Sequence, residues 1–385
     1  MKDLVLAGWD PGRLNNKLYL RDKKLINMNA ICGGYDRRTL NKEEGPLNNL
    51  LDVEVYRNKE YLGRYFVGYM AYMHNRGDLR WSASGVPKFS EAESSYDEII
   101  KMVTNLAFSQ YDPNNASKKV LFRLGTGSPT EEYFESPEIL ESFKDMMNVP
   151  YRVVFKHDNF NDAEIEVVVP KMYYKPEGTA SLISMAYKDD LTRDDRAKDI
   201  LDKGYMIIGM NIGSSTTDIA IMKPNMEFDD IGFFGINVGS NKALNEIRAV
   251  LYKDYGYDTT KLKVDYLIRK FSKVRYKGNI VNLEEIKKRP FNNLAALLKT
   301  KFYDEIEKRG IDTGEAGALF VSGGTVELIG DKLKNFISGV PTMLSLDPLY
   351  EDARGYYLEG KINEILEGES EKEVFEIDDD IQVVR

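Results

Sequence analysis

Three short apolar segments, each followed by a glycine-containing turn, organise the hydrophobic pattern of this chain. Their lengths are typical of strands that are buried in a sheet. They cover residues 4–7, 206–210 and 318–321. A second apolar segment follows the first two turns, so both turns predict β-hairpins. Because the openings at residues 4–20 and 206–222 are similar, we expect two lobes built on a common plan.

The rest of the pattern mixes strands and helices, which predicts an α/β fold. Alternating or β-rich positions predict strands at residues 25–31, 51–55, 61–68, 119–124, 151–155, 163–169 and 230–238. Apolar positions at helical spacing predict helices at residues 96–111, 137–147, 179–187, 243–251, 264–271, 294–306 and 349–366. We expect Pro290 to interrupt the pattern between residues 264–271 and 294–306, because proline removes a backbone hydrogen bond from a helix interior. The charge-dense segment 188–203 is expected to cross between the lobes.

Length and charge narrow the class of protein. The 385 residues predict two or three domains at about 150 residues each. The formal net charge of −9 argues against general affinity for nucleic acid, and the basic run Arg269–Lys277 is expected to be a solvated surface. No apolar stretch approaches the ~20 residues of a membrane-spanning helix. The N-terminal apolar run is too short for a signal peptide.

Cysteine and histidine are scarce. Cys32 is the single cysteine, so no disulfide can form within the chain, which is consistent with the reducing cytoplasm. His74 and His157 are the only histidines, and they are far apart in the sequence. We therefore do not expect a Ser-His-Asp triad or a His/Cys metal cage.

Both hairpin turns contain residues that suit a phosphate-binding loop. Such a loop needs backbone N–H groups that point inward, and small residues keep side chains out of the way. Gly12 meets this need in the first turn, and Gly213, Ser214 and Ser215 meet it in the second. Hydroxyl groups of Ser214 and Thr216 can also donate hydrogen bonds to phosphate oxygens.

Charged residues flank the first turn. Lys17 can place its ammonium group against the β- or γ-phosphate, and Asp10 can hold a hydrated Mg²⁺ ion. Taken alone, either turn could equally be a tight hairpin whose aspartate accepts hydrogen bonds from the turn. The third turn, Ser322–Thr325, follows in the order expected of a nucleotide-binding protein, and this order favours phosphate binding.

The order of these motifs resembles the superfamily of actins, Hsp70 chaperones and sugar kinases. Its members have a two-lobed, ribonuclease H-like α/β fold with a nucleotide cleft between the lobes. The motifs are residues 10–17 (first phosphate motif, D-x-G-x-x-x-x-K), 176–178 (start of the first connecting helix), 211–218 (second phosphate motif), 239–244 (second connecting helix) and 321–325 (adenosine motif, S-G-G-T).

Two further segments are similar to the bacterial ParM/StbA group of actin-like plasmid-segregation proteins. Residues 125–129 resemble the T-G-L-P turn of this group, and residues 352–357 resemble the N-x-x-G-Y-Y start of its C-terminal helix. The resemblance covers residues 4 to about 362. It implies lobe I at residues 1–187 plus 345–366, lobe II at 188–344 and an acidic, disordered tail at 367–385.

The resemblance also assigns site residues. It implies that ATP or GTP is bound with Mg²⁺, that Asp10 and Asp218 act at the metal, and that Glu177 orients the attacking water. Without the resemblance, Glu177 could simply be a carboxylate stabilised by a helix N-terminus. The implied nucleotide contacts are Gly12, Arg13, Leu14, Asn15, Lys17, Gly213, Ser214, Ser215, Thr216, Gly239, Lys242, Gly323, Gly324 and Thr325.

One residue departs from the family pattern. The second phosphate motif normally begins with aspartate, whereas this chain has Asn211. Asparagine keeps an acceptor oxygen but lacks a negative charge near the metal and the attacking water, and Asp218 compensates in part. We expect Asn211 to permit nucleotide binding and to slow or retune hydrolysis.

The implied function is that of a cytoplasmic actin-like ATPase which forms nucleotide-dependent filaments. By resemblance, the filaments segregate plasmid DNA through a DNA-bound adaptor protein, so neither direct DNA binding nor membrane binding is expected. One alternative is a non-polymerising phosphotransferase or ATPase of the same superfamily. Another is a filament with a cell-shape or other cytoskeletal role. An Hsp70 is disfavoured because no substrate-binding domain follows residue 366 in this sequence.

Overall fold

The structure, a computed structural model, describes residues 4–36, 45–81 and 95–371. These residues divide into two compact units. Of the described residues, unit 1 contains those up to Ser184 and those from Asp352 to Glu371, and unit 2 is Met185–Glu351. Unit 2 is therefore inserted into the sequence of unit 1.

A curved sheet forms the framework of unit 1. Its ten described strands have the order β3-β2-β1-β8-β10-β9-β5-β6-β4-β7. The strands are β1 (Val5–Pro11), β2 (Asn15–Leu20), β3 (Lys23–Met28), β4 (Ala30–Gly33), β5 (Asp52–Arg57), β6 (Glu60–Val67), β7 (Arg80–Trp81), β8 (Ser117–Ser128), β9 (Tyr151–Phe155) and β10 (Glu164–Pro176). β1 is antiparallel to β2 and parallel to β8, which is parallel to β10. The first predicted hairpin is therefore confirmed, while the strand expected at residues 25–31 is divided between β3 and β4.

The four helices that the sequence predicted in unit 1 are present, and the structure adds two short ones at Tyr69–His74 and Thr130–Glu135. Over residues 137–147 the observed and predicted helices coincide, as α4 shows. The helices are α1 (Tyr69–His74), α2 (Ser95–Ser109), α3 (Thr130–Glu135), α4 (Pro137–Met147), α5 (Glu177–Ala186) and α11 (Glu351–Glu371), together with the 3₁₀ turns Leu47–Asn49 and Asp158–Phe160. The predicted helix 349–366 thus continues to Glu371, and the remaining acidic tail lies outside the described residues.

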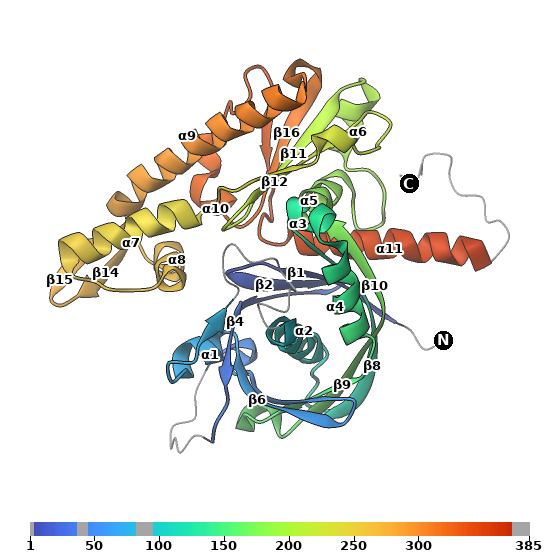
Figure 1. Ribbon diagram of the computed structural model, residues 1–385, viewed down its shortest axis with the longest axis vertical. Coiled ribbons are helices and arrows are strands. Elements are labelled where there is room, and N and C mark those ends of the chain that lie inside the picture. Colours follow the sequence, from blue (N-terminus) through green and yellow to red (C-terminus); the bar gives the residue numbers. More distant parts are fainter. Residues whose placement is uncertain (1–3, 37–44, 82–94, 372–385) are drawn as a thin grey trace. The chain divides into compact units, whose positions relative to one another are not determined.

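Helix α2 is enclosed by the curve of the sheet (Figure 1). Apolar side chains cover most of its surface, and every residue from Glu98 to Ser109 is buried. A helix that is buried all round needs little polar surface. Even so, α2 carries the polar residues Glu98, Lys101, Thr104 and Asn105 into the core. These side chains must find partners inside the protein.

Helix α11 packs closely on the rest of unit 1, and glycines make this close contact possible. A Cβ atom at Gly8 would clash with the carbonyl oxygen of Ala353, and one at Gly355 would clash with that of Ala180. Backbone therefore packs on backbone where α11 meets β1 and α5, which only glycine permits. Farther along α11, burial raises the pKa of Glu359, which lies 3.6 Å from the ammonium group of Lys175.

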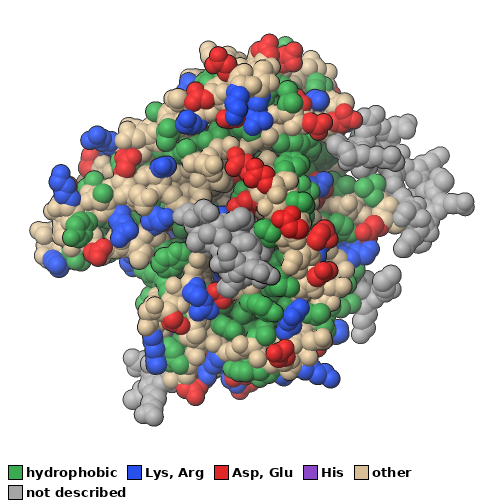
Figure 2. All heavy atoms as spheres, viewed as in Figure 1, with side chains coloured by type: hydrophobic (Ala, Val, Ile, Leu, Met, Phe, Trp, Pro, Cys, Tyr) green, Lys and Arg blue, Asp and Glu red, His purple; other side chains and the backbone are tan. Residues whose placement is uncertain are grey.

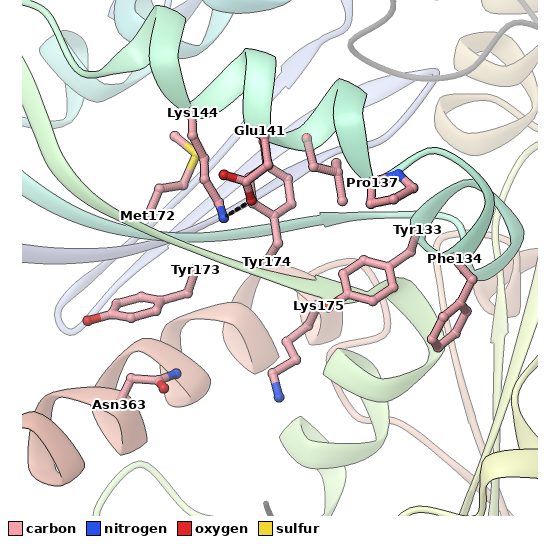
Figure 3. A pocket seen from close by; sticks show the side chains of 11 residues that line it. Tyr133, Phe134, Pro137, Glu141, Lys144, Met172, Tyr173, Tyr174, Lys175 and Asn363 are labelled. Atoms are coloured by element: carbon pink, nitrogen blue, oxygen red, sulfur yellow. Dashed lines mark hydrogen bonds and ion pairs between the residues drawn. The ribbon is translucent and has the colours of Figure 1, made fainter.

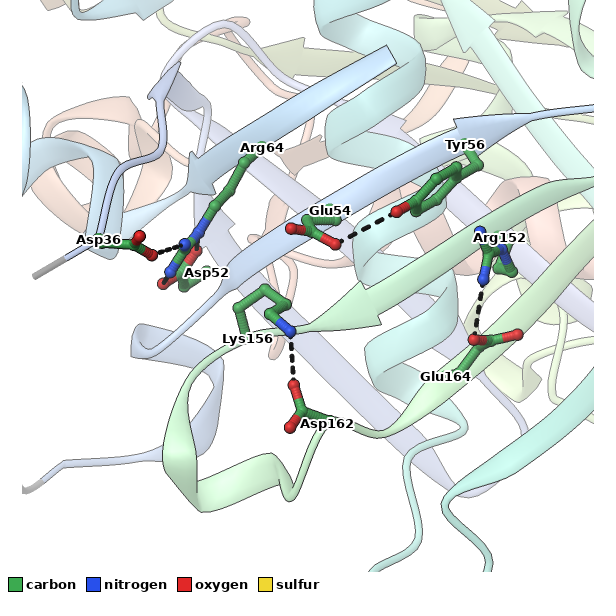
Figure 4. Close-up of polar contacts among 9 residues, drawn as sticks. All are labelled: Asp36, Asp52, Glu54, Tyr56, Arg64, Arg152, Lys156, Asp162 and Glu164. Carbon is green, nitrogen blue, oxygen red and sulfur yellow. Dashed lines mark hydrogen bonds and ion pairs between the residues drawn. The ribbon is translucent and has the colours of Figure 1, made fainter. Parts of the chain in front are cut away.

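Charged side chains form pairs on the neighbouring strands β9, β5 and β6 and on the segments beside them (Figure 4). Arg64 donates two hydrogen bonds to the buried Asp52, at 2.9 and 2.8 Å, and also pairs with Asp36. The hydrogen bond to Asp52 raises the pKa of Arg64. Lys156 and Asp162 form a more exposed pair at 2.6 Å. Of these two pairs, only Arg64–Asp52 has a buried carboxylate, and loss of Arg64 would leave that carboxylate without this partner.

Unit 2 repeats the strand plan of unit 1 in a smaller sheet. Its order is β13-β12-β11-β16-β17, with β11 antiparallel to β12 and parallel to β16, as β1 is to β2 and β8. The strands are β11 (Met206–Ile212), β12 (Thr217–Met222), β13 (Phe234–Ile236), β16 (Ala316–Ser322) and β17 (Thr342–Leu344). The prediction of a common plan is confirmed. The strand predicted at 230–238 is shorter in the structure, because Asp230–Gly232 form a 3₁₀ turn and only β13 is extended.

The helices of unit 2 are α6 (Asp195–Asp202), α7 (Asn241–Tyr255), α8 (Lys261–Lys270), α9 (Leu283–Arg309) and α10 (Val326–Ile329), together with the 3₁₀ turns Thr313–Glu315 and Gly330–Leu333. The sequence predicted helices at the positions of α7, α8 and α9, but not α6 or α10. The charge-dense segment 188–203 contains α6, where two charged residues separate the buried Ala197 from the buried Ile200 and Leu201. This alternation explains why a short helix was not evident from the charge pattern.

The prediction for Pro290 is wrong. This residue lies inside α9, buried, and the helix runs through it without a break. Proline there lacks one backbone hydrogen bond, but burial of Phe291, Leu294 and Leu298 on the same helix offsets that loss. The helical pattern is interrupted earlier instead, by the hairpin of β14 (Lys273–Tyr276) and β15 (Asn279–Asn282).

Basic side chains gather at the end of unit 2 that carries this hairpin (Figure 2). Lys270, Lys273, Arg275 and Lys277 are exposed there. These residues of the predicted basic run are therefore a solvated surface, as expected. Arg269 is the exception, because its side chain is only 19% exposed.

We expect Arg64→Met to destabilise the protein by about 3 kcal/mol, because it leaves the Asp52 carboxylate buried without its partner. Urea unfolding would measure the change. Lys156→Met is the matched control, since its partner Asp162 is 72% exposed, and it should cost less than about 1 kcal/mol. Equal effects of the two substitutions would contradict this assignment.

Candidate functional site

The first predicted phosphate turn joins β1 and β2. The two charged residues of the motif, Asp10 and Lys17, are directly paired in the hairpin register, and the Lys17 ammonium lies 2.6 Å from the Asp10 carboxylate. A Cβ atom at Gly12 would lie 2.7 Å from both the Lys17 ammonium and the carbonyl oxygen of Asn15. The turn thus closes tightly over an ion pair, and lysine keeps further N–H donors for an anion.

Arg13 and Asn29 attach this turn to the rest of unit 1. Arg13 donates a hydrogen bond of 2.9 Å to Glu132 of α3. The side-chain amide of Asn29 donates to the carbonyl oxygen of Gly12 at 2.8 Å, and its backbone N–H donates to that of Leu14 at 2.9 Å. The carbonyl groups of the turn are therefore occupied from inside the unit.

Glu177 is placed by the parallel strands. It is the first residue of α5 and follows directly on β10, whose last residues pair with Gly127 and Ser128 of β8. β8 in turn is parallel to β1, so Asp10 and Glu177 lie at the same edge of the sheet with β8 between their strands. Glu177 is 8% exposed. The sequence-predicted catalytic residues of unit 1 therefore share one sheet edge.

The second predicted phosphate turn joins β11 and β12. Gly213 N–H donates to the carbonyl oxygen of Thr216 at 2.9 Å, which closes the turn. Asn211 and Asp218 are directly opposite each other in the register, and both are buried. The Asp218 carboxylate accepts a hydrogen bond of 3.0 Å from the Thr216 hydroxyl. The hydroxyl of Thr216 is thus oriented by Asp218.

Two other turns of unit 2 converge on this hairpin. From the start of α7, Ser240 N–H donates to the Gly213 carbonyl at 3.2 Å and Asn241 N–H donates to that of Ser214 at 2.8 Å. From the adenosine-type turn, the Thr325 hydroxyl donates to the Gly213 carbonyl at 2.7 Å. The predicted motifs at 211–218, 239–244 and 321–325 therefore meet in one place.

Two glycines make this convergence possible. A Cβ atom at Gly239 would lie 2.6 Å from the carbonyl oxygen of Gly213. Gly323 has a φ of 93°, and a Cβ atom there would clash with the Asn211 side chain and approach the Ile212 carbonyl oxygen to 2.5 Å. Both positions require glycine because the backbone approaches the hairpin closely. Lys242, in contrast, is exposed on the first turn of α7.

Arg269 belongs to this site, although the sequence placed it only in a basic run. Its guanidinium group donates to Gly324 O at 2.9 Å, to Asp265 at 2.9 and 3.0 Å, and to Glu327 at 2.8 Å. The i,i+4 spacing of Asp265 and Arg269 in α8 signals their ion pair. The contact with Gly324, 55 residues away, has no comparable signal.

Among residues 4–36, 45–81 and 95–371, no group of three or more His, Cys, Asp or Glu side chains could hold a metal ion. Asp10 and Asp218 each present a single buried carboxylate. That chemistry fits Mg²⁺, which takes one or two carboxylates and completes its shell with phosphate oxygens and water.

A separate cavity of about 450 Å³ lies in unit 1 between α4, β10 and α11 (Figure 3). Tyr133, Phe134 and Tyr173 supply much of its wall, and Lys144 pairs with Glu141 at its side. None of the sequence-predicted nucleotide residues lines it. The cavity is therefore distinct from the phosphate turns.

No helix within the described parts of the chain is long and apolar enough to cross a membrane.

The strand order of the two sheets, with a phosphate-type hairpin in each, defines an actin-like ATPase fold. Comparison with solved structures shows the same fold over nearly the whole chain. A non-polymerisable quadruple mutant of pCBH ParM superposes with a TM-score of 0.72 at 18% identity, covering 94% of this chain and 100% of that one. ParM of Bacillus thuringiensis with ADP gives 0.69 at 16% identity, covering 94% and 100%.

An archaeal actin homologue gives a TM-score of 0.69 at 14% identity, covering 93% of this chain and 100% of the homologue. B. thuringiensis ParM has also been solved with AMPPNP. Neither a protein-family model nor a curated protein sequence matches this chain. The chain thus has the fold of the ParM proteins and the archaeal actin homologue, at sequence identities that establish the fold alone.

We expect Gly323→Ala to be more destabilising than Gly204→Ala. Both glycines have positive φ, 93° and 81°, so each substitution strains the backbone by roughly 1 kcal/mol. Only Gly323 is also crowded, whereas a Cβ atom at Gly204 meets nothing within 4 Å. We expect an additional cost of about 2 kcal/mol at Gly323. Chemical denaturation would measure both variants, and equal losses would show that crowding at the hairpin is unimportant.

Proposed function

We propose that this protein is an actin-like ATPase that assembles into nucleotide-dependent filaments. The observation that carries the proposal is that both hairpins have their turn carbonyl groups held by the protein. In a trans peptide the C=O and the following N–H point in opposite directions, and the described backbone contains no cis peptide. The N–H groups after Gly12, Gly213 and Ser214 therefore face away from the anchors, as an anion-binding turn requires.

In this proposal the two hairpins bind the phosphates of ATP, or of GTP, with Mg²⁺. The Lys17 ammonium and the hydroxyl groups of Ser214 and Thr216 would donate hydrogen bonds to phosphate oxygens. The carboxylates of Asp10 and Asp218 would act at the Mg²⁺ ion. Mg²⁺ would neutralise phosphate charge as the terminal phosphoryl group leaves. Glu177 would accept a hydrogen bond from the attacking water and orient it. The remaining nucleotide contacts are those assigned from the sequence, with Arg269 holding the turn at Gly324 in place.

Filament formation is proposed from the similarity of the whole fold to ParM structures, one of which is described as a non-polymerisable mutant. Nucleotide binding would favour the polymer, and loss of phosphate would favour disassembly, because the two nucleotide states make different contacts. We further propose a cytoplasmic role in plasmid segregation through a DNA-bound adaptor protein, consistent with the net charge of −9. We favour this over a non-polymerising phosphotransferase or another cytoskeletal role because the segments at 125–129 and 352–357 resemble motifs of the ParM group.

We expect the purified protein to form sedimentable filaments with Mg²⁺ and ATP, and to stay soluble with ADP or without nucleotide. Pelleting, light scattering and negative-stain images would measure assembly, and parallel samples with GTP would establish the base preference. A protein that remains monomeric at all concentrations, with turnover stimulated by a small-molecule acceptor, would instead be a phosphotransferase.

We expect Asn211→Asp to raise the rate of phosphate release about ten-fold, equivalent to 1.4 kcal/mol of barrier. The added carboxylate would restore a negative charge near the Mg²⁺ ion and the attacking water. It would also face Asp218 across the hairpin, so the variant should be less stable without Mg²⁺. Phosphate release and thermal melting with and without Mg²⁺ would test both effects. Unchanged or slower release would contradict the role assigned to Asn211.

A further inference from the structure

A buried ion pair lies behind the first phosphate turn, inside the curve of the sheet. Lys101 of α2 is 1% exposed, and its ammonium lies 2.5 Å from the carboxylate of Glu98, one turn earlier in the helix. The same ammonium donates a hydrogen bond to the side-chain oxygen of Asn29. An ion pair at this depth is costly compared with apolar side chains of similar volume, so stability alone does not explain it.

The ammonium group decides which way the Asn29 amide faces. Lysine has only donors, so Asn29 must turn its oxygen toward Lys101. The NH₂ group of the same amide is then directed to the carbonyl oxygen of Gly12, 2.8 Å away. A flipped amide would set two donors against each other at Lys101 and two acceptors against each other at Gly12.

Asn29 thereby holds the turn at two points. Its side chain binds the Gly12 carbonyl and its backbone N–H binds the Leu14 carbonyl, at 2.9 Å. Since the peptides are trans, the N–H groups of Arg13 and Asn15 point the other way. In unit 2 the corresponding anchors are backbone and hydroxyl groups of the α7 and α10 turns.

We infer that Lys101, oriented by Glu98, is a positioning residue for phosphate binding, because it fixes the Asn29 amide that orients the N–H groups of the first phosphate turn. This inference rests on the proposed function only in that the ligand is a nucleotide. The anchoring of the turn itself can be tested without any ligand.

The decisive variant is Asn29→Asp, which is nearly isosteric and keeps a strong acceptor for Lys101. Aspartate cannot donate to the Gly12 carbonyl, so the turn loses its side-chain anchor, while the backbone bond to Leu14 and the ion-pair cluster remain. The matched control is Asn105→Asp. Asn105 is also buried. Its side-chain amide donates a hydrogen bond of 2.7 Å to the backbone carbonyl of Lys101, but it does not contact the turn.

Two measurements separate positioning from stability. We expect Asn29→Asp to weaken the binding of Mg²⁺ and ATP at least about ten-fold, while Asn105→Asp binds as the wild type does. We also expect faster amide hydrogen exchange at residues 12–15 in Asn29→Asp without nucleotide, and no such change in Asn105→Asp. Equal effects of the two variants on binding and on exchange would overturn the inference.

A second variant covers the case in which Asn29→Asp does not fold. Replacing the ion pair by apolar residues, Glu98→Leu with Lys101→Met, should preserve or raise the melting temperature. It should nevertheless weaken ATP binding and speed exchange at residues 12–15, because the Asn29 amide is then free to flip. Wild-type affinity and exchange in this variant would overturn the role of Lys101. Failure of the wild type itself to bind nucleotide would refute the proposed function, while the exchange comparison would still decide the anchoring.

Discussion

The site depends on one backbone constraint, the planarity of the trans peptide. A turn can offer N–H groups to an anion only if the carbonyl groups of the same peptides have partners elsewhere. In unit 2 these partners are the start of α7 and the Thr325 hydroxyl. In unit 1 the partner is Asn29. The glycines, the helix positions and the buried polar residues around the turns all serve this requirement.

The two units provide hydrogen-bond partners for their turn carbonyl groups in different ways. Their central strands have the same order and directions, yet the hairpin of unit 2 is held by residues from turns at neighbouring strand ends. The hairpin of unit 1 is held by a side chain whose orientation comes from a charge in the core. The N–H anchors from Ser240 and Asn241 tolerate substitution, and the Thr325 anchor needs only a hydroxyl. The side-chain anchor of unit 1 depends on the identity of three residues, Glu98, Lys101 and Asn29.

Much of the fold and the outline of the site could be predicted from the sequence, because local signals carry them. Apolar runs followed by glycine turns located both hairpins, with Asp10 and Lys17 flanking the first turn, whereas their direct pairing across the hairpin is seen only in the structure. Pro290 was misjudged because burial in a long helix outweighs a local preference. The contacts of Lys101 with Asn29 and of Arg269 with Gly324 span 72 and 55 residues, so local patterns do not contain them.

The packing of α11 on glycines has a consequence for biosynthesis. Gly8 of β1 meets Ala353, a residue that the ribosome adds only after the whole of unit 2 has been made. Domains generally fold as units during synthesis. Unit 2, as Met185–Glu351, is continuous in sequence and can fold while the chain is still being made, whereas unit 1 must wait for α11 with β1 and β8 uncovered. Completion of unit 1 is therefore coupled to the synthesis of α11, and the same dependence delays any assembly that requires both units until α11 has left the ribosome.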